Sequence, residues 1–261
     1  MTARTPPPPP SSPLSPTPLR PSLRLRELAL DLAALVWPTA CVGCGAADRE
    51  CCRSCRARIG EPPEMLAREL DGLPCIVRGR YEGPLRAVLV AFKHGGRESF
   101  RRMLGEALRA PLLRAIRLAA PSAPAGAPGE PGAPLVVAMP SRPRGVRERG
   151  YRHLDLLIAS ALRRQRAPAL RVRALRTTRG RVGQVGLRAA QRERNARRIA
   201  VRRAARRVIH GRRVVLVDDI ITTGASVRAA RDALERAGAS VAVIVALCTA
   251  ERRDAAGLPA K

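Results

Sequence analysis

The chain has 261 residues, of which 46% are hydrophobic and only 2% aromatic. This length holds one full α/β domain and a small appendage, and scarce aromatic side chains exclude a core built from anything but Val, Leu, Ile and Ala. A net charge of +28 points toward nucleic acid, but nearly all of it is arginine, since lysine occurs only at Lys93 and Lys261. GC-rich codons specify arginine, so genomic bias and a preference for polyanions are both open explanations of the charge.

Two segments precede the first cysteine. Residues 1–22 are rich in proline and serine without an apolar period, so we expect a disordered or polyproline-like tail, unless they lie upstream of the true start. Residues 23–37 are typical of an amphipathic helix. A secretory signal is the alternative, but Glu27 and Asp31 interrupt its apolar run. No later run is long enough to cross a bilayer, so we expect a cytoplasmic location.

Five of the seven cysteines fall between residues 41 and 55. They include two CxxC pairs, a spacing with which four thiolates can converge on a structural zinc ion: Cys41, Cys44, Cys52 and Cys55. A redox dithiol or a group of incidental buried thiols is the alternative to a metal site. Cys51 is an alternative ligand to Cys52, because three intervening residues are also permissible. Residues 23–75 are therefore assigned to an N-terminal helix and zinc ribbon.

From residue 76 onward, short apolar runs alternate with helical periods. Strands are predicted over 76–81, 135–140, 170–175, 213–217 and 241–247, and helices over 85–116 with a break at 93–96, 154–162 and 225–237. Residues 119–134, rich in Ala, Pro and Gly, are expected to be a flexible insertion. Strands separated by helices in this order give an α/β fold with a parallel sheet over 76–250, followed by a tail over 251–261.

An acidic motif follows the most apolar of these strands. Residues 214–217 are typical of a strand buried on both faces, which we expect to end at Asp218 and Asp219. Small residues and hydroxyls then lead into a helix: Thr222, Thr223, Gly224, Ala225 and Ser226. Carboxylates at a strand end accept hydrogen bonds from vicinal sugar hydroxyls or serve a magnesium-bound ribose, and helix N-terminal amides bind phosphate. The motif predicts a phosphosugar site; an ordinary strand-to-helix turn with surface carboxylates is the alternative.

Two arginine-rich segments, which we expect to be loops, flank this motif in sequence. Residues 141–151 directly follow the predicted strand 135–140, so they emerge at the same sheet edge as the acidic pair. Arg147 and Arg149, with Lys93, are candidate pyrophosphate ligands because guanidinium groups bind phosphate oxygens bidentately. The second segment, 179–198, suits a lid over the site, with three candidate residues: Gln184, Arg192 and Asn195. A solvated arginine surface is the alternative for both segments.

The segment 214–226 resembles the phosphoribosyl pyrophosphate (PRPP) signature of type I phosphoribosyltransferases almost residue for residue. The resemblance implies that Asp218 and Asp219 bind the ribose hydroxyls of PRPP. It also implies that the loop 222–226 binds the 5′-phosphate, and that PRPP enters with Mg²⁺.

Over residues 25–250 the chain resembles the ComF family. The resemblance rests on the two CxxC pairs, Tyr81-Glu82-Gly83-Pro84-Leu85 running to Phe92-Lys93-His94-Gly95-Gly96-Arg97, Met139-Pro140 with Arg149-Gly150-Tyr151, the spaced Gln184, Leu187, Arg192 and Asn195, and the Asp218 motif. That family joins an N-terminal zinc ribbon to a type I phosphoribosyltransferase fold, and its members are linked to natural competence, the uptake of DNA. The chain departs from the family at Arg152-His153, where Asn-Gln is usual, and it has arginines in 179–184 where hydroxyl residues are usual.

Three functions are compatible with these features. In the first, the protein is a ComF-type phosphoribosyltransferase in which Asp218 and Asp219 are catalytic and the acceptor is unnamed, since no aromatic residue follows Gly238 to recognise a base. In the second, it is a non-catalytic phosphosugar sensor that binds single-stranded DNA or a competence partner. Few aromatic residues are present to stack bases, so such DNA binding would act through phosphates. The third is nucleotide salvage unrelated to DNA uptake.

Overall fold

The computed structural model describes residues 40–47, 49–61, 66–120, 132–163, 169–178 and 199–250. The predicted N-terminal tail and helix, most of the insertion 119–134 and the C-terminal tail lie outside the described residues. The three candidate lid residues also lie outside them: Gln184, Arg192 and Asn195. No helix within the described ranges is both long and apolar enough to span a bilayer.

A tight turn carries the first CxxC pair. The amide of Cys41 donates to the carbonyl of Ala46 at 2.7 Å, and the amide of Gly45 donates back to the carbonyl of Cys41 at 2.8 Å. Gly45 has a φ of 79°, a conformation that glycine adopts without steric cost. Two backbone hydrogen bonds therefore close the turn that carries the first CxxC pair.

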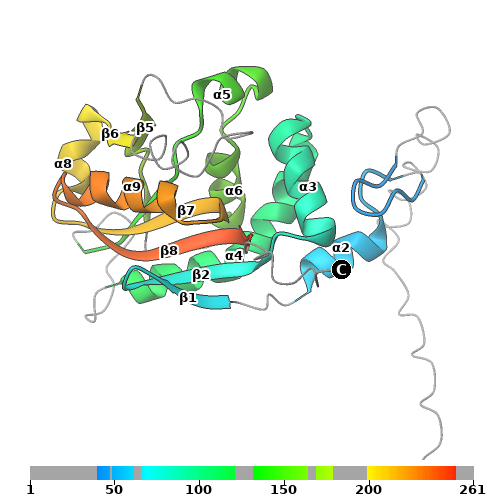
Figure 1. The fold of residues 1–261 in the computed structure, drawn as a ribbon, viewed down its shortest axis with the longest axis horizontal. Coiled ribbons are helices and arrows are strands. Elements are labelled where there is room, and N and C mark those ends of the chain that lie inside the picture. Colours follow the sequence, from blue (N-terminus) through cyan, green and yellow to red (C-terminus); the bar gives the residue numbers. More distant parts are fainter. Residues whose placement is uncertain are drawn as a thin grey trace, which may run out of the picture. The chain divides into compact units, whose positions relative to one another are not determined.

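The segment from residue 51 onward forms a six-stranded sheet with helices (Figure 1). Its elements are α2 (Arg53–Gly60), β1 (Leu66–Leu70), β2 (Leu73–Arg80), α3 (Gly83–His94), η1 (Glu98–Phe100), α4 (Arg101–Ala119), β3 (Leu135–Ala138), α5 (Pro143–Arg149), α6 (His153–Ala161), β4 (Leu170–Arg171), β5 (Leu175–Thr177), β6 (Ile199–Val201), η2 (Arg203–Ala205), α8 (Arg206–Ile209), β7 (Arg213–Ile221), α9 (Ala225–Glu235) and β8 (Ser240–Thr249). The strand order is β1-β2-β8-β7-β3-β4, and only β1 and β2 pair antiparallel. The predicted α/β fold with a mostly parallel sheet is confirmed.

The central strands β7 and β8 form the core of this sheet. Val214, Val215, Leu216 and Val217 have no exposed surface, as predicted for a strand covered on both faces. Helix α4 packs against β8 and α6, and α9 against β7 and β8. Helix α9 ends at Glu235, and Gly238, whose φ is 83°, turns the chain toward β8.

Three details differ from the sequence predictions. The strand predicted over 170–175 is two short strands, of which β4 joins the main sheet and β5 pairs with β6 in a separate one. The antiparallel strand β1 was not predicted, although the Asp71-Gly72 turn that joins it to β2 is a strong hairpin signal. Strand β7 does not end at Asp218 but continues to Ile221, because β8 remains paired with it as far as Thr249.

On the side of β7 that pairs with β3, the strand pairing ends just before the acidic pair. Strand β3 is paired with β7 only as far as Val217 and then turns away. From there the chain passes through α5 and α6 to β4 on one side, whereas α9 carries β7 to β8 on the other. Parallel sheets form a ligand crevice where neighbouring connections diverge in this way. The fold therefore places a crevice beside Asp218.

Candidate functional site

A cavity of about 920 Å³ occupies this crevice. Its walls come from the end of α3, the segment after β3 including α5, the end of β5, and the segment from the acidic pair into α9. All seven predicted ribose and phosphate ligands line it: Asp218, Asp219, Thr222, Thr223, Gly224, Ala225 and Ser226. Lys93 and Arg149 line it as well, whereas Arg147 is not among its lining residues. The structure thus brings together the acidic, hydroxyl and basic groups that the sequence separates.

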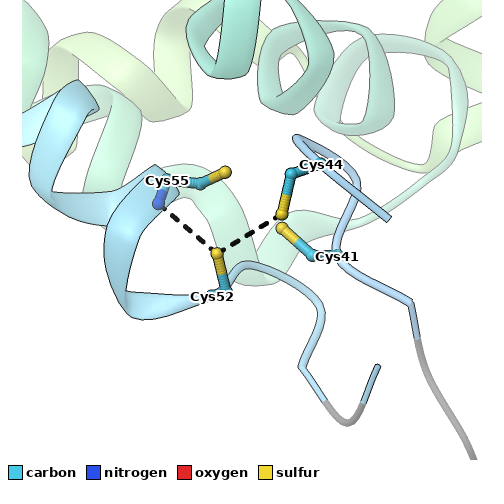
Figure 2. Close-up of side chains that lie close together, drawn as sticks. All are labelled: Cys41, Cys44, Cys52 and Cys55. Carbon is cyan, nitrogen blue, oxygen red and sulfur yellow. Dashed lines mark hydrogen bonds between the residues drawn. The ribbon is translucent and has the colours of Figure 1, made fainter. Parts of the chain in front are cut away.

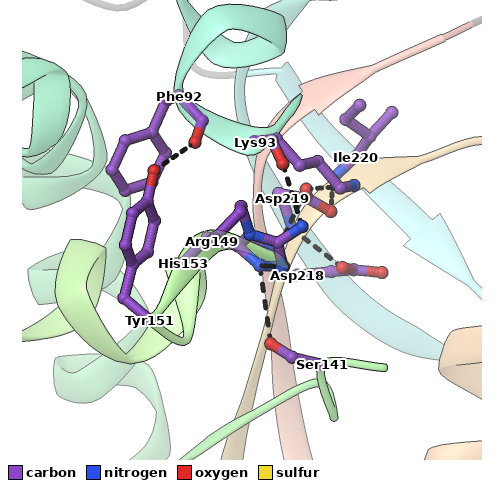
Figure 3. A network of polar contacts seen from close by, with 9 residues as sticks. All are labelled: Phe92, Lys93, Ser141, Arg149, Tyr151, His153, Asp218, Asp219 and Ile220. Carbon is purple, nitrogen blue, oxygen red and sulfur yellow. Dashed lines mark hydrogen bonds and ion pairs between the residues drawn. The ribbon is translucent and has the colours of Figure 1, made fainter. Parts of the chain in front are cut away.

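The two aspartates have different surroundings (Figure 3). Asp219 is 5% exposed, and its Oδ2 lies 2.5 Å from Nζ of Lys93 and 3.2 Å from Nε2 of His153. Asp218 is less buried, and its Oδ1 accepts a hydrogen bond from the amide of Asp219 at 2.8 Å. In the described part of the chain, no cation forms an ion pair with Asp218. The pair therefore consists of one neutralised carboxylate and one that faces the cavity without a counter-ion.

These surroundings move the pKa values of the two carboxyl groups in opposite directions. Burial and the charge of Asp219 raise the pKa of Asp218 to about 8. Burial alone would also raise the pKa of Asp219, but the ammonium of Lys93 and the hydrogen bond from His153 hold it well below its usual range. Burial alone would lower the pKa of Lys93, but the charge and hydrogen bonding of Asp219, together with the nearby Asp218, outweigh it and raise this pKa. Asp218 therefore keeps its proton to a higher pH than Asp219 does.

Basic side chains form the opposite wall. Nη1 of Arg149 donates to the carbonyl of Lys93 at 2.9 Å, which fixes the guanidinium against the end of α3. The hydroxyl of Tyr151 donates to the carbonyl of Phe92 at 2.6 Å, and the two rings stack with centroids 5.4 Å apart. These contacts hold the segment after β3 to α3 and leave basic groups beside the cavity. A concave site of this charge suits a phosphorylated ligand.

The loop after β7 has the shape expected of a phosphate cradle. Gly224 has a φ of 75°, a conformation that strains any residue with a side chain, and a Cβ at this position would also lie 2.8 Å from Cδ1 of Leu70. Helix α9 begins directly afterwards, so its first amides point toward the cavity end of the loop. The amide of Ala225 lies 3.5 Å from the hydroxyl of Thr223, a long hydrogen bond. Backbone donors and short hydroxyls thus lie at one end of the cavity, next to the acidic pair.

Two features of the site were not anticipated from the sequence. His153 was singled out only as a departure from a family pattern, yet it is 6% exposed and contacts Asp219. The segment 141–151 was expected to be a loop, but Pro143–Arg149 is a helix that begins at a proline and ends at Gly150, whose φ is 78°. The proline and glycine at its two ends were the available signal. This helix directs Arg147 away from the cavity lining and leaves Arg149 within it.

The cysteine group forms a second candidate site (Figure 2). The sulfur atoms of Cys41, Cys44, Cys52 and Cys55 all lie within 4.8 Å of one another. Four thiolates around zinc, with bonds of about 2.3 Å, would lie about 3.8 Å apart, so modest contraction suffices. Cys51 is not part of the group, which favours Cys52 as the fourth ligand.

Backbone geometry around the cysteines supports a metal site. The amide of Cys55 donates to Sγ of Cys52 at 3.4 Å, the kind of N–H···S contact that steadies a metal thiolate. A Cβ on Gly43 would lie 2.7 Å from Sγ of Cys55, so only glycine fits there. The donor set and its glycine therefore fit a structural zinc ion.

Comparison with known proteins identifies the segment around the cavity. Residues 173–259, which include the acidic pair and the loop after it, match the family model described as phosphoribosyl transferase domain. The matched segment makes up about a third of the chain. A comparison with curated proteins found no match.

Two solved structures are similar to parts of the chain. One is described as the structure of the allosteric regulatory enzyme of purine biosynthesis; it is 23% identical, with a TM-score of 0.28, over 53% of this chain and 26% of that one. The other, from an analysis of an invariant aspartic acid in HPRTs, is a glutamic acid mutant; it is 14% identical, with a TM-score of 0.36, over 63% of this chain and 74% of that one. This chain thus spans about a quarter of the first structure and about three quarters of the second.

The raised pKa of Asp218 predicts how stability depends on pH. The folded protein binds this proton more tightly than the unfolded chain, whose carboxyl has a pKa near 3.8, so the stabilisation is complete below that value and is lost as the pH rises toward about 8. Asp218 should therefore lower the free energy of unfolding by up to about 1.4 kcal/mol per pH unit between these limits. We expect Asp218→Asn to remove this slope in urea denaturation between about pH 5 and pH 7. Glu148→Gln, a change at an exposed carboxylate, should keep it; an equal slope in both variants would contradict the assignment.

The cysteine geometry predicts metal content. We expect about one zinc per purified chain by elemental analysis, because four thiolates complete a tetrahedral site. Cys52→Ala should lose the metal, whereas Cys51→Ala should retain it. A protein that folds without metal, or in which Cys51→Ala is the variant that loses it, would show that the ligand set is wrong.

Proposed function

We propose that the protein binds PRPP as a ComF-type phosphoribosyltransferase, with the pocket beside β7 as its active site. One observation carries the proposal: a single cavity joins the acidic pair, the loop at the start of α9, and the basic groups Lys93 and Arg149. These three parts match the ribose hydroxyls, the 5′-phosphate and the pyrophosphate of PRPP in chemistry. The match of residues 173–259 to a phosphoribosyl transferase domain supports the same ligand.

Each part of the cavity has a role in the proposed reaction. The carboxyl groups orient the ribose through its hydroxyls. The negative charge of the ionised Asp219 favours the positive charge that develops on the ring as pyrophosphate leaves C1 and the acceptor bonds to C1. The amides of the loop 222–226 fix the 5′-phosphate and with it the position of the sugar. Arg149 and Lys93 stabilise the departing pyrophosphate. Magnesium, bound with the ligand, would neutralise part of the pyrophosphate charge, and the carboxylate oxygens at the cavity suit this ion.

The cysteine group and the arginine content extend the proposal beyond the pocket. A structural zinc ribbon before a phosphoribosyltransferase-type domain is the arrangement of the ComF family, so we propose a role in DNA uptake within the cytoplasm. Four sulfur atoms within 4.8 Å of one another support the zinc ribbon. The resemblance alone supports the link to competence.

The pocket predicts magnesium-dependent binding of PRPP. We expect the double variant Asp218→Ala with Asp219→Ala to weaken binding by about a hundredfold or more in titration calorimetry, because it removes both carboxylates that accept the ribose hydroxyls. Circular dichroism should show that the variant remains folded. Asp232→Ala, which removes an exposed carboxylate of α9 outside the cavity, should bind like the original protein. Equal affinity in the double variant would refute the site.

Turnover separates an enzyme from a sensor. Incubation with PRPP, Mg²⁺ and a panel of bases and nucleic acids, followed by measurement of pyrophosphate release, tests for reaction with each acceptor. Binding without release under any of these conditions would favour the non-catalytic sensor, and release with a free base alone would favour nucleotide salvage.

A DNA-binding module is the second candidate, and one surface favours it. The segment from η2 to the start of β7 contains exposed arginines and no acidic residue: Arg203, Arg206, Arg207 and Arg213. Arginines without neighbouring carboxylates attract phosphate backbones. This surface can bind a single strand only through its phosphates, because it carries no aromatic residue.

This surface predicts salt-sensitive binding of single-stranded DNA. Each phosphate contact contributes a slope of about −0.7 to a plot of log affinity against log salt concentration. Replacing Arg203, Arg206 and Arg207 with glutamine should therefore reduce the slope by about 2 in fluorescence anisotropy titrations. Matched replacements of Arg114 and Arg117, exposed on α4, should leave it unchanged. A slope that is the same in both sets would exclude the segment as the DNA site.

A further inference from the structure

The tip of the β1–β2 hairpin packs against the loop that leads into α9. Asp71 and Gly72 form the two-residue turn of this hairpin, with φ values of 51° and 78°. A Cβ on Gly224 would lie 2.8 Å from Cδ1 of Leu70 and 3.0 Å from its Cδ2, so the backbone of the loop approaches this side chain closely. The hairpin therefore forms a wall beside the glycine of the loop 222–226.

Two arginines of α9 bind the same turn. Nε of Arg228 donates to Oδ2 of Asp71 at 2.5 Å, and Nη1 of Arg231 donates to the carbonyl of Asp71 at 3.0 Å. The amide of Arg228 donates to the carbonyl of Gly224 at 2.9 Å, so this arginine belongs to the first hydrogen-bonded turn of the helix. Asp71 is thus joined to the first two turns of α9 through both its side chain and its backbone.

We propose that Leu70 and Asp71 are positioning residues for the loop 222–226: they hold Gly224 and the first turn of α9, and so fix the backbone amides that meet the 5′-phosphate. This inference rests on the proposed function and deepens it, because it gives the phosphate end of the ligand a support outside the segment that matches the family model. Within the described part of the chain, neither residue is among those that line the cavity, so each acts through the loop.

The backbone and the charge of Asp71 both suit this role. A φ of 51° is unfavourable for most residues with a side chain, and aspartate is one of the few that adopt it readily. Glycine would form the turn as easily but has no carboxylate for Arg228. Because the helix dipole disfavours a cation in the first turn, this carboxylate also offsets an electrostatic cost of Arg228. The two side chains are 45% and 44% exposed, so the contribution of the pair is modest.

Ligands that carry only one end of PRPP separate positioning from general stability. We expect Asp71→Asn, which tolerates the left-handed φ but lacks the charge, to weaken ribose 5-phosphate binding by about twofold to fivefold, the range of one exposed ion pair. The affinity for pyrophosphate with Mg²⁺, which uses the other end of the cavity, should not change. Glu106→Gln removes a comparable ion pair on α4 and should alter neither affinity. Equal weakening for both ligands, or for neither, would overturn the inference.

A double-variant comparison tests the contact with Arg228. Arg228→Gln should weaken ribose 5-phosphate binding as much as Asp71→Asn does. The double variant should bind no more weakly than either single one, because both changes remove the same pair. Losses that multiply in the double variant would contradict this, since they would show that the two residues act independently.

The packing contact of Leu70 has its own matched pair of variants. Leu70→Ala removes the side chain beside Gly224 and should weaken ribose 5-phosphate binding, whereas Leu70→Met keeps the volume and should bind like the original protein. Equal affinities of these two variants would overturn the role of Leu70.

Hydrogen exchange measures the support without any ligand. The amides of residues 228–231 are the first to bond within α9, and we expect them to exchange about twofold to fivefold faster in Asp71→Asn than in the original protein. Amides in the middle of β7 and β8 should keep their rates. Unchanged exchange at 228–231 would overturn the inference. If the original protein binds neither PRPP nor ribose 5-phosphate, the proposed function fails, and the exchange rates still decide whether the hairpin holds the loop.

Discussion

The buried carboxylate of Asp219 is the constraint on which the rest of the site depends. A charge that is 5% exposed is costly unless a cation and hydrogen bonds accompany it. Lys93 supplies the cation, with its Nζ 2.5 Å from Oδ2 of Asp219, and Nε2 of His153 lies 3.2 Å from the same oxygen. These partners come from helices far away in sequence, so the need to neutralise one carboxylate fixes the ends of α3 and α6 beside β7. The cavity walls are placed by the same requirement.

Because β3 diverges from β7, a cavity opens beside these charged groups. The strands pair as far as Val217, and the cavity opens at the next residue. On one side of the opening is the glycine-containing loop that leads into α9, and on the other are Lys93 and Arg149. A ligand that has hydroxyls between two phosphate groups matches this order of acceptor and donor groups. The match to a phosphoribosyl transferase domain covers one wall of the opening.

Patterns within single elements were sufficient to predict much of this from sequence. The valine-rich run predicted β7, the CxxC spacing predicted the cysteine group, and the acidic pair with its glycine loop predicted the lining of the cavity. Contacts between distant elements were not predictable in this way. The sequence around His153 does not show that a carboxylate lies 3.2 Å away, and the end of β7 depends on the length of β8. Proline and glycine at the ends of α5 were informative, but the direction of Arg147 depends on the turn of that helix.

The partners of Asp219 also bear on where the folding unit begins. The matched segment starts at residue 173, yet Lys93, Arg149 and His153 all precede it, as do β2 and β3 on either side of the central strands. A piece of chain cut to the matched boundaries would keep the acidic pair but lose the cation that neutralises it and the strands that bury it. The segment that matches the family model is therefore shorter than the segment that is needed to fold the sheet around the acidic pair. A chimaera that carried only the matched segment would contain the two carboxylates without the lysine that neutralises Asp219.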